Sequence, residues 1–566
     1  MIRIKSIITQ YLKESPDEHD QLTQLRDLLE HCPNDEDLVS RKNYVGHITA
    51  SGFVVSRCRT KVLRLNHKKL GIYLQPGGHF QSGDPSLLAA ARRKIAEEAG
   101  LSSLDYLASH FEDEIPIDID THYINATDSE PRHFHHDFRY LFLCEDKEGK
   151  VVINEEKFQD YKWGDINELL RMQTFSTLKQ KIEKTLSGEF RPKVFFDRLS
   201  KQLQIPAGAN TIVVTHLLQD AQVYLRTLDK VSHILSVIPK PKSIDTTVLS
   251  TARTHFTINQ SDRETLQTSN IVRDLLRSAA GRVVLFDIGG YFAPLVNDLV
   301  DSFPGKLVGV IEDTENGHQK YDRAQPLKVP VFSVARSPLK DNEDFLVGQS
   351  VLFSADAILR EVGKLIQYLD CSVFGYGKIG GSIADHLSRR GAKVSVFDKD
   401  PIRRMAASNR LCKIPDREQI IKQSDVIFCA TGGQVLKIHD FRALKPGCVV
   451  FSVTSSDDEM DITYLNAEYL AEDVTQHVTK FSSFSNHFYL VNKGNAVNFI
   501  HKAALGDFIH IVRGEMIYAL KVLLEQPPDP GIHELTQKQR SELAELWLKT
   551  FASEPAHYSD LAVGGI

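Results

Sequence analysis

The sequence predicts a multi-domain protein in which an α+β unit is followed by doubly wound α/β domains. A chain of 566 residues is too long for one hydrophobic core. Up to about residue 185 the chain shows strand patterns and two helices, one from about Ser86 to Ala99 and one after a strand in "DYKWGDINELLRM". Beyond it, apolar strands that end in Gly or Asp alternate with helices. That second pattern is typical of a buried parallel sheet with a ligand crevice at the carboxyl ends of its strands.

Composition excludes several classes of protein. A hydrophobic content of 42% with 25% charged residues is ordinary for a globular chain, so we do not expect disorder. The formal charge of −6 gives no overall basic field, so we expect small-molecule partners and neither nucleic acid nor membrane. Seven widely spaced cysteines without a CxxC pair indicate reduced thiols and a cytoplasmic protein. No apolar run approaches the roughly 18 residues needed to span a bilayer.

The first candidate site is the segment "GGHFQSGDPSLLAAARRKIAEEAGL", residues 77–101. Its glycines form a turn that precedes a helix from about Ser86 to Ala99, which Gly100 ends. Arg93 and Glu97 are four residues apart and share one helix face. Adjacent carboxylates beside a tight glycine loop favour a Mg²⁺ or Mn²⁺ site. The alternative is a solvated glutamate pair before a glycine cap.

This segment resembles the Nudix box, and "LGIYLQPGGH" and "HFHHDFRYLF" are similar to one bacterial branch of that family. The resemblance implies a Nudix fold and metal-dependent hydrolysis of a nucleoside diphosphate derivative. It further implies that Arg93 braces the helix and that Glu97, Glu98 and the backbone of Gly78 bind the metal. Lys94 departs from the pattern, because it replaces an acid that assists the metal or the water. Its positive charge opposes a cation, so both hydrolysis and binding without hydrolysis stay open.

A histidine-rich strand lies near the end of the first unit. In "HFHHDFRYLFL" one predicted strand face carries His133, His135 and Asp137, and the opposite face is aromatic. The two histidines could form a transition-metal ligand pair. Strand histidines more commonly satisfy hydrogen bonds beside a cleft, which is the alternative.

The second candidate site is a dinucleotide motif. "CSVFGYGKIGGSIADHLSRRGAKVSVFDKDP" places GxGxxG between a strand and a helix, and Asp398 ends the next strand. Glycines let a pyrophosphate approach the helix N-terminus, and the acid accepts hydrogen bonds from ribose hydroxyls. We therefore predict a Rossmann-type domain that binds NAD. Arginines just after Asp398 leave NADP open, and a glycine turn without ligand is the alternative.

Residues 283–510 resemble S-adenosylhomocysteine hydrolase through the runs "GVIEDTENG", "VPVFSVARSPLKDNEDFLVGQS", "GYGKIGGSIADHL", "DDEMDI" and "KGNAVNF". That family uses NAD to oxidise the ribose 3'-hydroxyl, eliminates homocysteine, adds water and reduces the product back. The resemblance implies that Lys340 and Asp344 are catalytic and that Asp287 and Asp313 contact substrate. The expected NAD contacts are Gly375, Gly377, Lys378, Ile379, Gly380, Asp398, Thr431 and Asn498.

The sequence also departs from that family. Ser455 and Leu505 stand where the family has histidines, and Ala335 and Phe345 replace two asparagines. We therefore expect an activity related to, but not identical with, S-adenosylhomocysteine hydrolysis. For Lys340 and Asp344 the alternative is a surface ion pair at i,i+4 spacing. His216 could match an early substrate histidine of the family, and a histidine at a helix start is the alternative.

We expect a Nudix-like domain over residues 1–188 and a Rossmann NAD-binding domain over residues 356–496. A substrate domain is expected over residues 189–355, completed by residues 497–566, with a linker near 186–193. The predicted function is bifunctional nucleotide metabolism in a homo-oligomer, with NAD and Mg²⁺ or Mn²⁺ as cofactors. The alternative is a regulatory protein that senses nucleotide and NAD through a non-catalytic Nudix domain.

Overall fold

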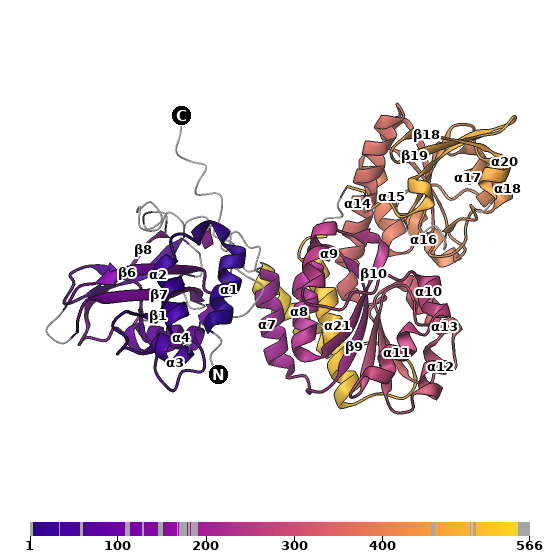
Figure 1. Cartoon of the computed structure of the whole chain (residues 1–566). Helices are drawn as coiled ribbons and strands as arrows, with labels where there is room; N and C mark the ends of the chain where they lie inside the picture. The colour runs from indigo at the N-terminus through magenta and orange to yellow at the C-terminus, as the bar shows by residue number, and fades with distance from the viewer. Residues whose placement is uncertain are drawn as a thin grey trace, which may run out of the picture. The chain divides into compact units, whose positions relative to one another are not determined.

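The computed structural model separates the chain into two compact units, Met1–Arg198 with Leu546–Ile566 and Leu199–Glu545 (Figure 1). Across the described part of the chain, no helix is both long and apolar enough to cross a membrane. The domain boundaries expected from the sequence stay predictions. The described residues are 4–32, 34–56, 60–102, 104–107, 114–126, 130–144, 151–166, 168, 178, 181–182, 191–453, 459–462, 464–498, 500–501 and 505–552.

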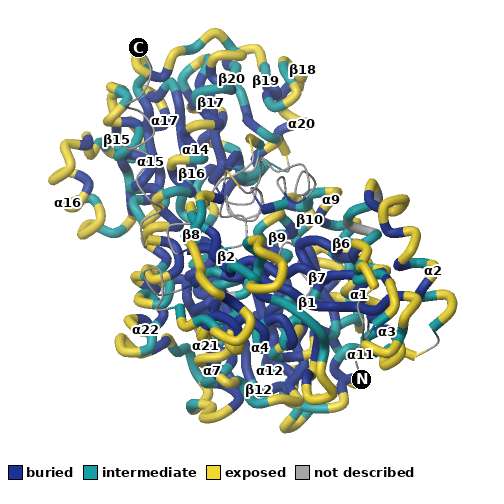
Figure 2. The backbone as a smooth tube through the Cα atoms, turned by 90° about the vertical axis from the view of Figure 1, so that its left-hand side faces the viewer, coloured by how far each residue is buried: buried dark blue, intermediate teal, exposed yellow. Residues whose placement is uncertain are grey.

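The first unit is built on an eight-stranded sheet with the order β3-β2-β1-β7-β5, in which β4 pairs with β1, β6 with β7 and β8 with β2. The central strands β1 and β7 pair in parallel and are buried along most of their length (Figure 2). The strands are β1 Gly46–Val55, β2 Lys61–His67, β3 Tyr73–Leu74, β4 Gly77–His79, β5 Leu104–Tyr106, β6 Asp118–Ile124, β7 His133–Cys144 and β8 Phe158–Asp165.

Helix α4 is the first predicted helix of this unit and spans Leu87–Ala99, whereas the helix predicted in "DYKWGDINELLRM" lies mostly outside the described residues. The Ser86 side chain accepts a hydrogen bond from the backbone N–H of Ala89, and Gly100 ends the helix in the left-handed conformation at φ 68°. Ile95 packs against the sheet at Gly52, where a Cβ would meet the Ile95 side chain at 2.6 Å. The sequence patterns did not predict the three helices before the sheet, α1 Ile4–Glu14, α2 Thr23–His31 and α3 Asp35–Val39.

The second unit contains a six-stranded parallel sheet with the order β10-β9-β11-β12-β13-β21. Helices α8 and α21 lie on one side of this sheet and α10 to α13 on the other, which confirms the predicted doubly wound fold (Figure 1). The strands are β9 Asn210–Leu217, β10 His233–Ile244, β11 Val283–Asp287, β12 Leu307–Glu312, β13 Pro330–Ser333 and β21 Gly531–His533. The helices are α8 Ala221–Val231, α9 Thr246–Arg253, α10 Arg263–Thr268, α11 Ile271–Ser278, α12 Val296–Ser302, α13 Glu315–Arg323 and α21 Phe508–Glu525. Helices α7 Arg191–Leu203 and α22 Gln537–Trp547 each include residues of both units.

A third, seven-stranded sheet has the order β15-β14-β16-β17-β20-β19-β18, and only its last two pairings are antiparallel. Its parallel part is the predicted Rossmann-type sheet. The strands are β14 Asp370–Phe374, β15 Lys393–Phe397, β16 Val426–Cys429, β17 Cys448–Ser452, β18 Leu470–Thr475, β19 Val478–Ser482 and β20 His487–Val491. The helices are α14 Asp341–Glu361, α15 Lys378–Arg389, α16 Pro401–Asn409, α17 Arg417–Gln423, α18 Ile438–Ala443 and α20 Leu465–Glu468.

A buried carboxylate determines the start of α13. Glu312 is 0% exposed and accepts hydrogen bonds from the backbone N–H groups of Gly289, Gly290 and Thr314 at 2.7–3.0 Å. A Cβ on Gly317, in the first turn of α13, would lie 2.0 Å from this carboxylate. The carboxylate cannot move aside without losing those hydrogen bonds, so residue 317 has to be glycine.

We predict that Gly317→Ala lowers the free energy of unfolding by roughly 1–3 kcal/mol, because the methyl group displaces Glu312 from its hydrogen bonds. The matched control is Gly381→Ala, in the first turns of α15, where a Cβ meets nothing closer than 3.9 Å. The control should leave stability unchanged or raise it by up to about 1 kcal/mol. Denaturant unfolding measures both variants, and equal stabilities would contradict this role of Gly317.

Candidate active sites

Arg93 holds the glycine loop of the first site against helix α4. Its guanidinium donates two hydrogen bonds to the Asp84 carboxylate, each 2.7 Å, and a third to the backbone carbonyl of His79 at 3.1 Å. A further bond of 2.9 Å reaches Glu97 on the same helix face. The planar guanidinium suits such two-point binding of a carboxylate. Arg93 therefore lies where the sequence predicts a brace between loop and helix.

The two predicted metal ligands are already paired with protein cations. Glu98 is 3% exposed and accepts a hydrogen bond from the backbone N–H of Gly77 at 3.1 Å, and Lys157 Nζ lies 3.3 Å from its second oxygen. Burial raises the pKa of Glu98 above its ordinary value. Lys94 Nζ donates to Glu97 at 2.9 Å. Burial raises the pKa of Glu97, but the hydrogen bonds from Lys94 and Arg93 outweigh it and hold this pKa below its ordinary value.

Lys94 itself lies between the helix and the glycine loop. It is 8% exposed, and a Cβ on Gly78 would meet its side chain at 3.3 Å. Gly78, the predicted backbone ligand, therefore contacts the lysine stem. The carboxylates fit the chemistry of Mg²⁺, but a divalent cation here has to compete with the ammonium of Lys94.

The glycine-rich loop of the second site has the geometry that its sequence predicts. Gly375 has φ 92°, and a Cβ there would lie 2.5 Å from the carbonyl oxygen of Ala430. A Cβ on Gly380 would lie 2.0 Å from the carbonyl oxygen of Gly375. A Cβ on Gly377, in contrast, would meet no atom closer than 3.6 Å. The first and third glycines are needed for packing, and the second leaves the backbone open to a ligand.

Asp398 lies at the carboxyl end of β15 beside this loop. It is 6% exposed and accepts hydrogen bonds from the backbone N–H groups of Tyr376 at 2.7 Å and Asp400 at 2.9 Å. Arg403 is 3.7 Å from the same carboxylate. The acid therefore lies where a ribose hydroxyl would meet it. Lys378 and Ile379 begin helix α15 immediately after the loop.

Two further expected NAD contacts lie on loops after the sheet strands. Thr431 donates its hydroxyl to the carbonyl of Gly433 at 2.6 Å, and its backbone N–H donates to Glu459 at 2.9 Å. Asn498 is 7% exposed, and its Oδ1 is buried without a hydrogen-bond partner among the described residues. A buried amide oxygen without a partner is costly. Together with the open loop at Gly377, it shows that the residues present fit a bound dinucleotide.

Lys340 is the centre of a buried charge cluster. It is 6% exposed, and its Nζ donates to Asp313 and to Glu343, both at 2.8 Å. The alternative of a surface ion pair with Asp344 is therefore wrong. Asp344 is 7% exposed and adds negative charge to the cluster without a direct hydrogen bond to Lys340. The structure thus brings together Lys340, Asp344 and Asp313, three residues that the sequence predicted for one site.

Burial and charge act in opposite directions within this cluster. Burial lowers the pKa of Lys340, but Asp313, Glu343 and Asp344 outweigh it and raise this pKa above its ordinary value. Burial raises the pKa of Asp344, and it raises the pKa of Glu343 to about 7. Lys340 is therefore charged, and Glu343 is the carboxylate that takes up a proton most readily. Sequence reasoning missed Glu343, although its spacing of three residues from Lys340 was a usable signal.

Lys378 connects the glycine-rich loop to this cluster. Its Nζ donates to the backbone carbonyl of Ser337 at 3.0 Å and that of Ala335 at 3.3 Å. It also lies 2.9 Å from Asp341 and 4.0 Å from Asp344. The predicted cofactor loop and the predicted reaction centre are therefore neighbours, which the sequence alone could not show.

The Asp287 carboxylate is hydrogen-bonded to groups of its own domain. It is 0% exposed, accepts backbone hydrogen bonds from Tyr291 and Phe292 at 3.0 Å, and accepts the Tyr321 hydroxyl at 2.6 Å. These contacts hold the turn after β11. A substrate contact through Asp287 stays a prediction that none of these internal contacts supports.

The remaining sequence expectations have mixed outcomes. His216 lies in β9, so the alternative of a helix start is wrong, and its Nδ1 pairs with the Ser243 hydroxyl. Burial lowers its pKa, and Lys340 is among the cations that lower it further. Ser455 lies outside the described residues, as does most of the expected linker, whereas residues 191–193 belong to α7.

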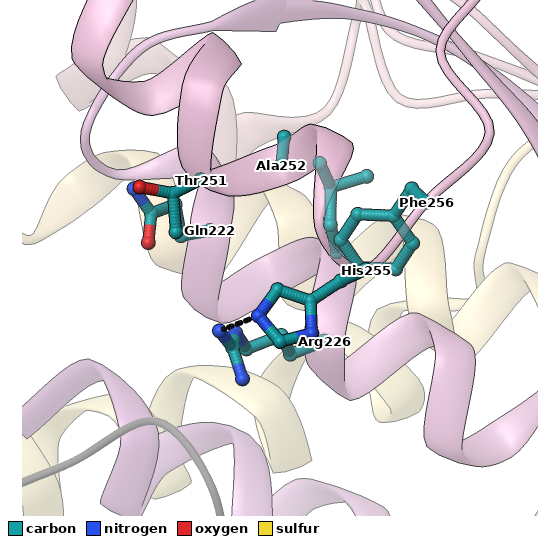
Figure 3. A pocket seen from close by; sticks show the side chains of 7 residues that line it. Gln222, Arg226, Thr251, Ala252, His255 and Phe256 are labelled. Atoms are coloured by element: carbon teal, nitrogen blue, oxygen red, sulfur yellow. Dashed lines mark hydrogen bonds between the residues drawn. The ribbon is translucent and has the colours of Figure 1, made fainter. Parts of the chain in front are cut away.

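A shallow pocket between α8 and α9 lies outside both candidate sites (Figure 3). Figure 3 shows Arg226 hydrogen-bonded to His255 at its edge, over 2.8 Å. Its cavity volume is about 10 Å³, far below the roughly 300–1,000 Å³ of ligand pockets. We assign no ligand to it.

Two family models match the chain, a NUDIX domain over residues 46–184 and the NAD-binding domain of S-adenosyl-L-homocysteine hydrolase over residues 348–503. A similar protein is the S-inosyl-L-homocysteine hydrolase of Methanothermobacter thermautotrophicus, 27% identical over 268 residues. That match covers 44% of this chain and 62% of the relative, so the chain spans less than two thirds of the relative's length.

Two solved structures are also similar to part of the chain. An Ap4A hydrolase binary complex from C. elegans has a TM-score of 0.19 and 16% identity, and covers 25% of this chain and 95% of its own. A NUDIX family hydrolase from Clostridium perfringens has a TM-score of 0.19 and 22% identity, and covers 24% of this chain and 96% of its own. The two family matches by themselves show that the chain joins a Nudix domain to an NAD-binding domain of the S-adenosyl-L-homocysteine hydrolase type.

Proposed function

We propose that the second unit is an NAD-dependent enzyme that acts on a ribonucleoside thioether. The observation that supports it best is the buried cluster of Lys340 with Asp313, Glu343 and Asp344, which Lys378 ties to the glycine-rich loop. Burying four charged groups carries a large desolvation cost, so a cluster of this kind contributes little to the stability of a fold. Perturbed ionisable groups in such a place are typical of a reaction centre.

NAD, when bound, supplies the hydride acceptor for a ribose hydroxyl. In this proposal Lys340 first passes one proton to Glu343, whose pKa burial raises to about 7, and the neutral amine of Lys340 then accepts the proton of that hydroxyl as the ribose carbonyl forms. Asp313 binds a neighbouring hydroxyl. Asp344, whose pKa burial raises, takes or returns a proton at the ribose ring. Burial of all three side chains excludes water from the exchange.

The substrate class follows from two considerations. The similar S-inosyl-L-homocysteine hydrolase suggests a purine ribonucleoside joined to homocysteine through sulfur. This chain has Ala335 and Phe345 where the S-adenosyl-L-homocysteine hydrolase family has asparagines, so recognition of substrate differs from that family's. S-inosyl-L-homocysteine is therefore the first compound to assay, with S-adenosyl-L-homocysteine as the comparison.

We predict that NAD(H) remains bound through purification. Asp398→Ala should lower the affinity for NAD(H) at least tenfold, and with it the occupancy at equal total NAD. The loss of one charged hydrogen-bond acceptor for ribose, about 1.4 kcal/mol or more, is sufficient for this change. Nucleotide released by acid is measured by chromatography. The control is Asp385→Ala, which removes a carboxylate of α15 that pairs with Arg410. This variant should retain the cofactor. Full occupancy in Asp398→Ala would exclude Asp398 from the site.

We predict that Lys340→Gln lowers turnover of a ribonucleoside thioether by about 10²–10⁴-fold while NAD(H) occupancy stays unchanged. Homocysteine release measures the turnover. The control Lys328→Gln changes an exposed lysine of the same unit, which pairs with Asp301, and should turn over normally. Unimpaired homocysteine release by folded Lys340→Gln would contradict the proposed role.

We propose for the first unit a Mg²⁺- or Mn²⁺-dependent hydrolysis of a nucleoside diphosphate derivative. The intact frame of the box supports it, because Arg93 and Glu98 hold the glycine loop through Asp84 and Gly77. Lys94 then has to donate to the substrate phosphate, where its charge assists binding. If Lys94 instead keeps its bond to Glu97, the domain binds nucleotide without hydrolysis, which is the sensor alternative.

We predict weak metal-dependent hydrolysis that Glu98→Gln abolishes, whereas Lys94→Glu raises affinity for Mn²⁺ because it removes the competing ammonium. Phosphate-product release over a panel of nucleoside diphosphate derivatives measures the activity. Glu156→Gln, an exposed acid of the same domain, is the control. Equal rates for wild type and Glu98→Gln would place hydrolysis elsewhere, and activity that appears only in Lys94→Glu would establish a binding domain.

A further inference from the structure

Five histidines gather on neighbouring strands of the first unit's sheet. His47 on β1 pairs in register with His135 on β7, which pairs on its other side with His122 on β6. Side chains of paired residues project to the same face, and His133 shares that face because it precedes His135 by two residues. The ring centre of His47 lies 4.6 Å from His135, 4.9 Å from His133 and 5.0 Å from His79 on β4.

Backbone carbonyls fix the tautomers of two of these rings. His47 Nδ1 lies 3.3 Å from the carbonyl oxygen of Asn43, and His133 Nδ1 lies 2.7 Å from that of Pro131. A carbonyl oxygen only accepts, so in each ring the proton is on Nδ1. In the neutral rings Nε2 is then a bare lone pair. A metal-binding histidine is oriented in the same way by a hydrogen bond from its other nitrogen.

Ring nitrogens of three of these histidines lie close together. His47 Nε2 is buried and has no hydrogen-bond partner among the described residues, and the same holds for His79 Nε2. His133 Nε2 lies 3.2 Å from His135 Nε2, close to the ~3.3 Å between two nitrogens bound tetrahedrally to one zinc ion. One nitrogen from each of His47, His133 and His135 lies within 4.8 Å of the other two.

The chemistry of the cluster favours a transition metal. An all-imidazole set suits zinc and its neighbours among the transition metals, whereas Mg²⁺ requires oxygen ligands.

We infer that His47, His133 and His135 bind a divalent transition-metal ion of the zinc class on the sheet of the Nudix domain. Three imidazoles leave a fourth coordination position, which His79 or water completes. This site is separate from the carboxylates of α4, and the proposed hydrolysis does not use it. His79 directly follows Gly78, so the ion would also fix the glycine loop of the box to the sheet.

The test uses the untagged full-length chain after chelation and dialysis. Co²⁺ is titrated and followed by its visible absorption, and Zn²⁺ is then added in competition. We expect one ion of Co²⁺ per chain, displaced by Zn²⁺ and not by Mg²⁺. His133→Gln and His135→Gln should each weaken binding at least tenfold, since each removes one of three ligands.

The matched control is His136→Gln, because His136 directly follows His135 in the sequence, pairs with Thr121 and faces the other side of the sheet. It should bind Co²⁺ like wild type. Metal binding that survives in both ligand variants, or is lost equally in the control, would overturn the assignment. Should the ligand variants not fold, a rise in the melting temperature of wild type with Zn²⁺ but not Mg²⁺ supports the site, and its absence overturns it.

Discussion

The candidate site of the second unit depends on the pairing of the buried ammonium of Lys340 with carboxylates. Taking a charge out of water costs several kcal/mol, and only close partners of opposite charge offset that cost. Asp313 follows β12, and Glu343 and Asp344 lie in the first turns of α14, so the cluster forms only when the parallel sheet is complete. The fold positions these groups, and their mutual charges hold Lys340 in its protonated state.

The turn that carries Lys340 lies between the glycine-rich loop and the proposed reaction centre. Helix α21 packs against it from within the same unit, and Lys378 donates to two carbonyls just before it. The side chain of Lys378 therefore joins the glycine-rich loop to the proposed reaction centre. That link explains why a lysine at the start of α15 contributes to the site, whereas its glycine neighbours contribute only backbone.

Local signals in the sequence were sufficient for the parts of the fold that depend on neighbouring residues. The α4 caps and the GxGxxG turn follow from residue type, because Ser86, Gly100 and Gly375 each meet a local backbone requirement. The family resemblance added Lys340, Asp344 and Asp313. Glu343 was missed although its spacing of three residues from Lys340 is a local signal. The convergence of His47 and His79 on the β7 histidines could not be predicted, since it depends on strand register.

The first unit shows the limit of motif reasoning. The segment that resembles the Nudix box has Arg93 and the two glutamates where the resemblance predicts them. Lys94, however, lies between helix α4 and the glycine loop and pairs with Glu97. Whether a box of this kind works depends on where one ammonium goes when nucleotide binds, which spacing cannot reveal. His47, His133 and His135 of the same domain lie close enough together for the separate metal site that we infer.

The central claim is that the buried cluster around Lys340 is a redox centre next to bound NAD. The most direct measurement is rapid mixing of the NAD-loaded full-length protein with excess S-inosyl-L-homocysteine while nicotinamide absorbance is followed. The account predicts that reduced nicotinamide appears in the first turnover, at no more than one equivalent per chain. Unchanged absorbance with S-inosyl-L-homocysteine and with other ribonucleoside thioethers, although NAD and substrate are both bound, would contradict it.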